Sequence, residues 1–337
     1  MSENAFFNRL CLPFFLLMGS ILPENRLCGA FTKINFFTND TQHIYLFSDD
    51  HSIQEPHVNQ EQLKAVKALL DKYETSPTMK CLILAEIPAT CGLGSLSNRY
   101  TILAALPFIF NSLKLNNTTL KNYEIRTTTI PVIHLIQRAD KNLPIDNLTY
   151  YTQNIILTSN NITFNDIITE YTTWFTAITA LKNSHPAKTT ALFDEKLEDS
   201  KEFFEQFNSF LHDNNINEST LVINAIDQLA HRVYEQGPNA FYRLEYLLHD
   251  MINPLLDLWF FHHLINARDY NSLIVMAGGY HATVLTALLF RAGYCYKGAY
   301  NAKDCYLKES EFDLNTLLPS SLLKSVQTAI LKHLSFI

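Results

Sequence analysis

The sequence has little glycine and little charge: only 9 of its 337 residues are glycine, and 18% are charged. The formal net charge is −7, and basic residues form no run anywhere in the chain. A protein that binds the nucleic-acid backbone needs basic surface to release counterions, so we expect no nucleic-acid partner. Apolar residues make up 47% of the chain, which is typical of a globular protein and excludes a disordered one.

Several sequence patterns of catalysis and cofactor binding are also missing. Neither glycine fingerprint for binding phosphate occurs, and no serine lies in a nucleophile-elbow pattern. The six cysteines include no Cys-x-x-Cys pair and no Cys/His spacing typical of structural zinc. The chain has no internal repeat and no low-complexity linker. We therefore expect neither a nucleotide-binding loop nor a covalent serine or cysteine mechanism.

A short apolar stretch lies near the N-terminus. Arg9 precedes it, Pro23 ends it, and the small residues of Cys28-Gly-Ala30 come before Phe31. This order is typical of a secretory signal peptide, and the stretch is too short to span a bilayer. We expect residues 1–30 to be removed and the mature protein to be exported without a membrane span. An uncleaved N-terminal anchor or a buried helix is the alternative.

Cysteines that remain after the signal peptide can pair in an exported protein. Cys295 and Cys305 flank Gly298, so this segment can fold back as a hairpin. Cys81 and Cys91 lie at the start and beyond the end of a predicted strand, so we do not expect these two to meet.

Acidic and histidine side chains follow two predicted strands. Ile44–Phe47 is a short apolar run, and Ser48-Asp49-Asp50-His51 comes directly after it. Cys81–Ala85 is a second apolar run, which Glu86 follows. The carboxyl ends of parallel strands lie at one edge of a sheet, where open α/β sheets bind ligands. We therefore expect Asp49, Asp50, His51 and Glu86 to lie close together.

A third predicted strand, Leu273–Ala277, leads into a helix through a tight turn at Gly278-Gly279. Leucines at helical spacing follow, and Gly293 ends the helix. His281 lies where the helix begins. The positive end of the helix dipole disfavours an imidazolium there, so we expect a neutral imidazole suited to a base or a metal ligand. A histidine that only caps the helix is the alternative.

The rest of the chain is predicted to be mainly helical, apart from a strand at Ile130–Ile136. The predicted fold is α/β, with a mainly parallel central sheet flanked by helices. Residues 31–160 and 269–337 form the two halves of this domain, and residues 161–268 form a large all-helical insertion. Apolar spacing predicts helices over about 60–73, 102–113, 167–178, 193–211, 221–233, 241–264 and 320–334.

For several other polar residues, the sequence allows more than one direction of the side chain. Arg126 can either face the site or pair with Glu124, whereas the apolar neighbours of His134 favour a structural role. A further group lies near the end of the helix that leads into the third strand, and one of its members could reach the site. This group is Asp257, His262, His263 and Arg268.

Two mechanisms fit the histidines and acids at the strand ends. A divalent metal ion held by His51, Glu86, His281 and Asp50 could activate water. Alternatively, a histidine oriented by an acid could act as general base without a metal. The Asp-x-His pattern also resembles the first motif of calcineurin-like metallophosphoesterases, but their Gly-Asp, Gly-Asn-His and Gly-His-x-His motifs are missing from the sequence.

The order of motifs resembles the superfamily of TraB/PrgY proteins, TIKI metalloproteases, erythromycin esterases and ChaN haem-binding lipoproteins. Ser48-Asp-Asp-His51 stands where that superfamily has Gly-Glu-x-His, with Ser in place of Gly and Asp49 in place of Glu. Glu86 corresponds to the glutamate that follows, and Gly278-Gly-Tyr-His281 to the later Gly-x-x-His motif. Gly293-Tyr294 matches the end of the next helix.

The resemblance implies an exported hydrolase that cleaves a peptide or ester bond in a small-molecule or peptide substrate. Its catalytic residues would be His51, Glu86, His281 and Asp49. The ChaN members imply an alternative, a protein that binds haem or another small ligand without turnover. A third expectation is a scaffold of the same fold that has lost activity.

Overall fold

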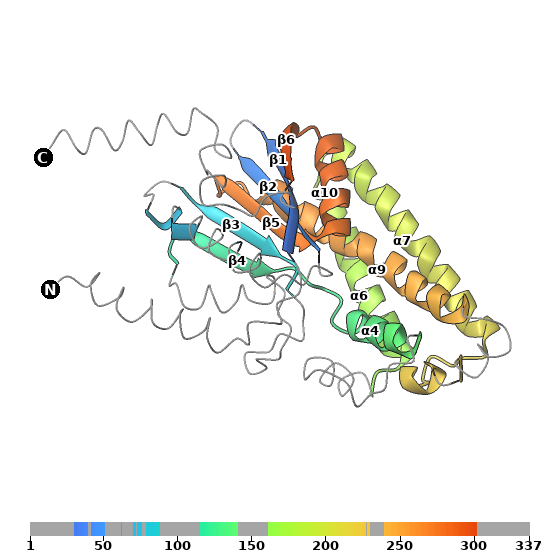
Figure 1. The fold of residues 1–337 in the computed structure, drawn as a ribbon. Helices are drawn as coiled ribbons and strands as arrows, with labels where there is room; N and C mark the ends of the chain where they lie inside the picture. The colour runs from blue at the N-terminus through green and yellow to red at the C-terminus, as the bar shows by residue number, and fades with distance from the viewer. Residues whose placement is uncertain are drawn as a thin grey trace, which may run out of the picture.

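A computed structural model describes residues 30–39, 42–50, 62, 70–71, 73–75, 79–87, 115–140, 161–226, 228–229 and 239–301. The elements along the chain are shown in Figure 1. They are β1 (Ala30–Thr38), β2 (His43–Asp50), β3 (Cys81–Ala85), β4 (Thr118–Asn122), α4 (Thr129–Asp140), α6 (Phe164–Lys182), α7 (Ala187–Asp213), α9 (Asn239–Asn266), β5 (Ser272–Gly278), α10 (Gly279–Ala292) and β6 (Cys295–Asn301).

The described strands form one mixed sheet in the order β4-β3-β5-β2-β1-β6. The pairs β3–β4, β3–β5 and β2–β5 are parallel, whereas β1 is antiparallel to both β2 and β6. The sheet is therefore mostly parallel, and the predicted α/β class is confirmed. The three strands predicted from apolar runs are β2, β3 and β5, and these lie side by side.

Strand β5 lies in the middle of this sheet and is buried on both faces. Leu273, Val275 and Ala277 face a core that they share with the helices, and Ile274 and Met276 face a smaller core on the other side. In Figure 1 the helices α6, α7, α9 and α10 gather on one side of the sheet. Burial on both faces explains why the strand is a continuous apolar run without alternation.

The register of the central strands places their carboxyl ends together. Asp49 pairs with Gly278 across β2 and β5, and Ala85 pairs with Met276 across β3 and β5. The next residue, Glu86, donates its backbone N–H to the carbonyl of Met276 at 2.9 Å. The predicted shared edge is therefore present in the fold.

The prediction of a strand at Ile130–Ile136 is wrong, because this segment lies in helix α4. Val132, Ile133 and Ile136 are all buried, at the spacing of one helix face. Pro131 is tolerated because it lies in the first turn, where no intrahelical partner for its N–H exists. The short apolar run that suggested a strand thus belongs to a helix whose inner face packs on α9.

The remaining predictions concern helices, the membrane and the cysteines. Helices α6, α7 and α9 cover the predicted helices at 167–178, 193–211 and 241–264. None of the described helices is long and apolar enough to cross a membrane. Cys81 and Cys295 are free. Residues 1–29, Cys91, Cys305 and the predicted helices at 102–113 and 320–334 lie outside the described residues.

Candidate functional site

A buried polar cluster lies at the carboxyl edge of the sheet, and we call it the Arg126 cluster. It draws on the residue after β3, the segment between β4 and α4, helix α9 and the first turn of α10. Because these segments are far apart in the sequence, only the folded sheet and helices bring their side chains together. Its members are Glu86, Glu124, Arg126, Asn253, Asp257 and His281.

Arg126 is the centre of the cluster and is only 3% exposed. Its guanidinium forms two parallel hydrogen bonds to Glu124, from Nε to Oε1 at 2.9 Å and from Nη2 to Oε2 at 2.7 Å. Nη2 also donates to Oε1 of Glu86, and Nη1 donates to Oδ1 of Asn253 at 2.9 Å. Nη1 lies 3.2 Å from Nε2 of His281. The planar fork of an arginine suits such a set of acceptors, and no lysine could replace it.

Glu86 connects Arg126 to the central strand. One carboxylate oxygen accepts from Arg126, and the other accepts the backbone N–H of Gly278 at 2.8 Å. The backbone of Glu86 is itself held by β5 through the carbonyl of Met276. Both carboxylate oxygens thus have donors, which is the condition under which a carboxylate can stay charged when it is 8% exposed.

His281 is bound to Asp257 on helix α9. Nδ1 of His281 lies 2.8 Å from Oδ1 of Asp257, and the two residues are 4% and 1% exposed. In the neutral imidazole this contact places the proton on Nδ1, because an ionised carboxylate only accepts. The lone pair on Nε2 then faces Arg126. Asp257 fixes both the tautomer and the direction of the ring, as an acid does beside a general base.

The carboxylates of the cluster favour the protonated form of His281. Burial lowers the pKa of His281, but the negative charges of Glu86 and Asp257 outweigh burial and raise the pKa above 6.5. Burial likewise raises the pKa of Asp257, and His281 opposes that change. These carboxylates therefore oppose the neutral imidazole that we expected from the helix dipole, whereas the contact of Nε2 with an N–H of Arg126 needs the neutral ring.

A second buried acid holds the segment that carries Arg126. Glu170 on α6 accepts the backbone N–H groups of Thr128 and Thr129, at 2.6 and 2.9 Å, and the hydroxyl groups of Thr127 and Thr129. These amides lie at the start of α4 and have no intrahelical partners. Glu170 therefore fixes the chain immediately after Arg126. The sequence offered one signal for it, the three consecutive threonines.

The structure brings some of the predicted site residues together. Oε1 of Glu86 lies 3.9 Å from Nε2 of His281. Asp49 is buried at the end of β2, beside the turn that leads to His281, and its carbonyl oxygen would lie 3.8 Å from a Cβ added at Gly279. The side chain of Asp50 and the whole of His51 lie outside the described residues.

The structure shows which groups Arg126 contacts and which polar residue near the end of α9 reaches the site. Arg126 pairs with Glu124 and also faces the site, so the two alternatives hold together. Of the polar residues near the end of α9, Asp257 reaches the site. Asn253, one turn earlier on the same helix, also reaches it, and nothing in the sequence marked that residue.

The described metal-ligand candidates, as placed, do not fit a divalent cation. Nε2 of His281 and Oε1 of Glu86 both face the guanidinium of Arg126, which already supplies positive charge between them. In the part of the chain that the structure describes, no group of three or more His, Cys, Asp or Glu residues could hold a metal ion. The other two expected ligands are His51 and the side chain of Asp50, which lie outside the described residues.

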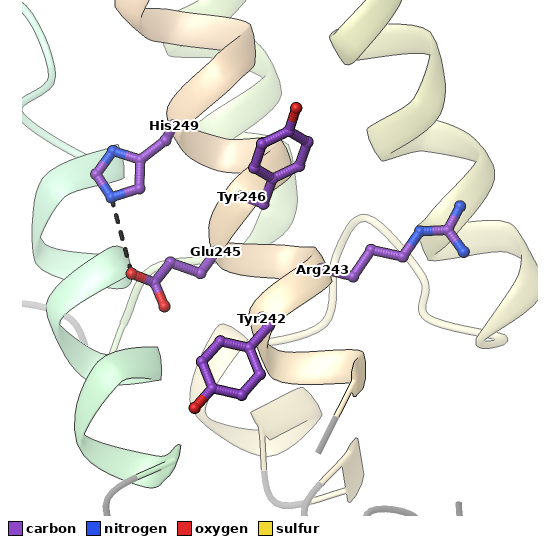
Figure 2. A pocket seen from close by; sticks show the side chains of 5 residues that line it. All are labelled: Tyr242, Arg243, Glu245, Tyr246 and His249. Carbon is purple, nitrogen blue, oxygen red and sulfur yellow. Dashed lines mark ion pairs between the residues drawn. The ribbon is translucent and has the colours of Figure 1, made fainter. Parts of the chain in front are cut away.

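An open pocket lies on the N-terminal half of α9, two turns before Asp257. Figure 2 shows its lining residues, with the ring of His249 directed toward Glu245. Nε2 of His249 lies 3.9 Å from Oε1 of Glu245. Burial, together with the positive field of Arg126, lowers the pKa of His249 to about 4, so this imidazole is neutral. The lining residues are Tyr242, Arg243, Glu245, Tyr246 and His249.

No protein-family model, no curated protein and no solved structure matches this chain. The resemblance to the TraB, TIKI, erythromycin esterase and ChaN proteins therefore rests on the short motifs and their order alone.

Proposed function

We propose that the protein is an exported hydrolase that cleaves a peptide or ester bond, with His281 as the general base. The observation that supports this proposal is the buried Asp257–His281 pair beside Arg126 and Glu86 at the carboxyl edge of the sheet. A base oriented by an acid, next to a fixed source of positive charge, is the arrangement that acyl transfer to water requires. The superfamily resemblance points to the same class of reaction.

In this mechanism the reactive form of His281 is the neutral ring, which forms above its raised pKa, and a water molecule replaces Nη1 of Arg126 at Nε2. Nε2 takes a proton from this water as the water oxygen attacks the carbonyl carbon of the substrate. Asp257 stabilises the imidazolium that forms, through the 2.8 Å contact at Nδ1. Four of the five N–H groups of Arg126 bind Glu86, Glu124 and Asn253, so the N–H of Nη1 that faces His281 is the one that can stabilise the negative charge on the carbonyl oxygen. The imidazolium then gives its proton to the leaving amine or alcohol, which restores the neutral ring.

The hydrolase is preferred to a haem-binding protein because of the surroundings of His281. Iron is a cation, and Nε2 of His281, the ring nitrogen that does not bond Asp257, lies 3.2 Å from the guanidinium of Arg126, whose positive charge opposes a metal ion there. A metal-assisted reaction would depend on His51 and Asp50 as further ligands. In this proposal residues 161–268 are a helical insertion into the α/β domain, and their function is to bring Asp257 to the site.

The test is hydrolysis of a panel of aryl esters and a mixed peptide library by the wild type, His281→Ala and Asp257→Asn. We expect a rate lower by a factor of about 10²–10⁴ in both variants, because each removes part of the general base. Asp250→Asn is the matched control, since it makes the same change two turns away on the same helix. Thermal unfolding of each variant checks that the fold is retained.

Two results would contradict the proposal. One is a wild type that hydrolyses neither panel, which would leave the binding or inactive alternative. The other is a folded His281→Ala variant with normal turnover, which would make His281 a structural residue.

A further inference from the structure

A pair of histidines lies apart from the Arg126 cluster, where the turn between α6 and α7 meets the end of α9. Nε2 of His185 lies 2.9 Å from Nδ1 of His262. The rings are nearly perpendicular, at an interplanar angle of 76°. Both side chains are half-buried, so one side of the pair faces solvent. We call these two residues the histidine pair, and the proposed hydrolase gives them no role.

Both imidazole rings are held in place by their neighbours. The ring of His185 stacks on Phe193 with centroids 4.8 Å apart, and Oγ1 of Thr190 donates to the carbonyl of His185. The ring of His262 lies parallel to Trp259 at an angle of 9°. Asn266 donates to the carbonyl of His262 at 2.8 Å. Two side chains whose rotamers are restricted by their neighbours lose little conformational entropy when they bind a ligand.

The facing nitrogens have the chemistry of metal ligands. Nδ2 of Asn266 lies 3.3 Å from Nδ1 of His262, which indicates that this nitrogen carries a lone pair. Nε2 of His185 is then the donor in the 2.9 Å hydrogen bond, and its proton is the one that a metal ion would displace on binding both nitrogens. An imidazole nitrogen is the commonest protein ligand of borderline divalent transition metals.

We propose that His185 and His262 together bind one divalent transition-metal ion of the zinc, nickel and copper type. Two nitrogens at about 2.0–2.1 Å from a tetrahedral metal are about 3.3 Å apart. The rings would therefore separate by only a few tenths of an ångström from their present 2.9 Å. Water from the solvent side completes the coordination, because the described residues offer no third strong ligand. The site is labile, and its metal joins the α6–α7 turn to α9.

The experiment is a Zn²⁺ titration of the full chain by isothermal calorimetry in chelator-free buffer, with His185→Gln, His262→Gln and a control. The control is His212→Gln, because His212 has a side chain that is 91% exposed and lies outside the pair. We expect one binding event that weakens by more than about tenfold in either pair variant and is unchanged in the control.

A second measurement separates lost ligands from lost structure. His185→Gln loses the ring contact with Phe193 even without metal, so the melting temperature of each protein is compared with and without Zn²⁺. Zn²⁺ should raise the melting temperature of the wild type, reversibly with a chelator, but not that of His185→Gln. The proposal is overturned if the wild type binds no Zn²⁺, or if the wild type and both pair variants bind it equally.

Discussion

Among the described residues, two bidentate arginine–glutamate pairs have the same chemistry and opposite surroundings. Arg126 and Glu124 at the edge of the sheet have side chains that are each 4% exposed. Arg291 and Glu195, which join α10 to α7, have side chains that are each 46% exposed. Both pairs are bidentate, with N···O distances between 2.5 and 2.9 Å. Distance alone therefore does not tell how much each pair contributes to stability.

The two pairs differ in what surrounds their charges when the arginine and the glutamate separate. Water solvates Arg291 and Glu195 when they separate, so their attraction is partly cancelled and screened. Arg126 cannot leave its acceptors without stranding several carboxylates away from water. Burial thus makes each member of the Arg126 cluster depend on the others. Such dependence is costly for stability, and it is common where a site must hold charges in a fixed geometry.

Two histidines, His281 at the sheet edge and His263 near the end of α9, also differ because of their surroundings. Among carboxylates at the sheet edge, the pKa of His281 rises above 6.5 although the ring is buried. Near the end of α9, His263 packs edge-on against Tyr123 and Trp259. There burial, aided by the charges of His262 and Lys121, lowers the pKa of His263 to about 4. Carboxylate neighbours, and not burial by itself, decide which form of the ring is stable.

Arg126→Met gives the largest expected effect and sharpens the comparison of the two arginines. The substitution keeps the volume of the side chain but leaves Glu86, Glu124 and Asp257 without their shared cation. We expect the free energy of unfolding to fall by about 3–5 kcal/mol, as when one partner of a buried pair is removed. Urea denaturation at neutral pH measures it. A loss below 1 kcal/mol would mean that water reaches the cluster.

The second prediction concerns opposite pH dependences of the two kinds of histidine. His281 contributes stability that is present below pH 6.5 and is lost as pH rises through its raised pKa in the folded protein. His263 contributes stability that is present above pH 6.5 and is lost as pH falls toward 4.

We therefore expect His281→Asn to flatten the stability profile above pH 6.5, and His263→Gln to flatten it between pH 6.5 and 4. Each change should remove about one proton from the linkage slope in its own range. Urea midpoints from pH 4 to 9 measure both slopes. If both variants altered the same range, the contrast between the two regions would be wrong.

Arg291→Met should have the smallest effect, because the pair it breaks is exposed. We expect a loss of at most about 1 kcal/mol at low salt, and almost none in 1 M salt, where charges are screened over about 3 Å. Denaturation at the two salt concentrations measures it. A loss as large as that of Arg126→Met would show that exposure is a poor guide to the strength of these pairs.

The sequence by itself determined the central strands and the edge they share. Apolar runs of strand length, each followed by polar residues, identified β2, β3 and β5, and parallel pairing then placed Glu86 near His281. These conclusions follow from local composition and from the rule that parallel strands end at one edge. The helix at Thr129–Asp140 was missed because a short apolar run fits both periods, and its N-terminal acceptor is Glu170 on another helix.

Only the tertiary structure decided what surrounds His281. Asp257 lies 24 positions before it and Arg126 lies 155 positions before it, on segments that the sequence placed in no fixed orientation. The rotation of α9 about its axis is set by the apolar residues that it buries against α7 and the other neighbouring helices, and this rotation directs Asn253 and Asp257 toward the cluster. The charge state of His281 follows from those neighbours. The sequence pattern alone cannot specify this charge state, because electrostatic energy depends on distances between segments, and only the fold fixes those distances.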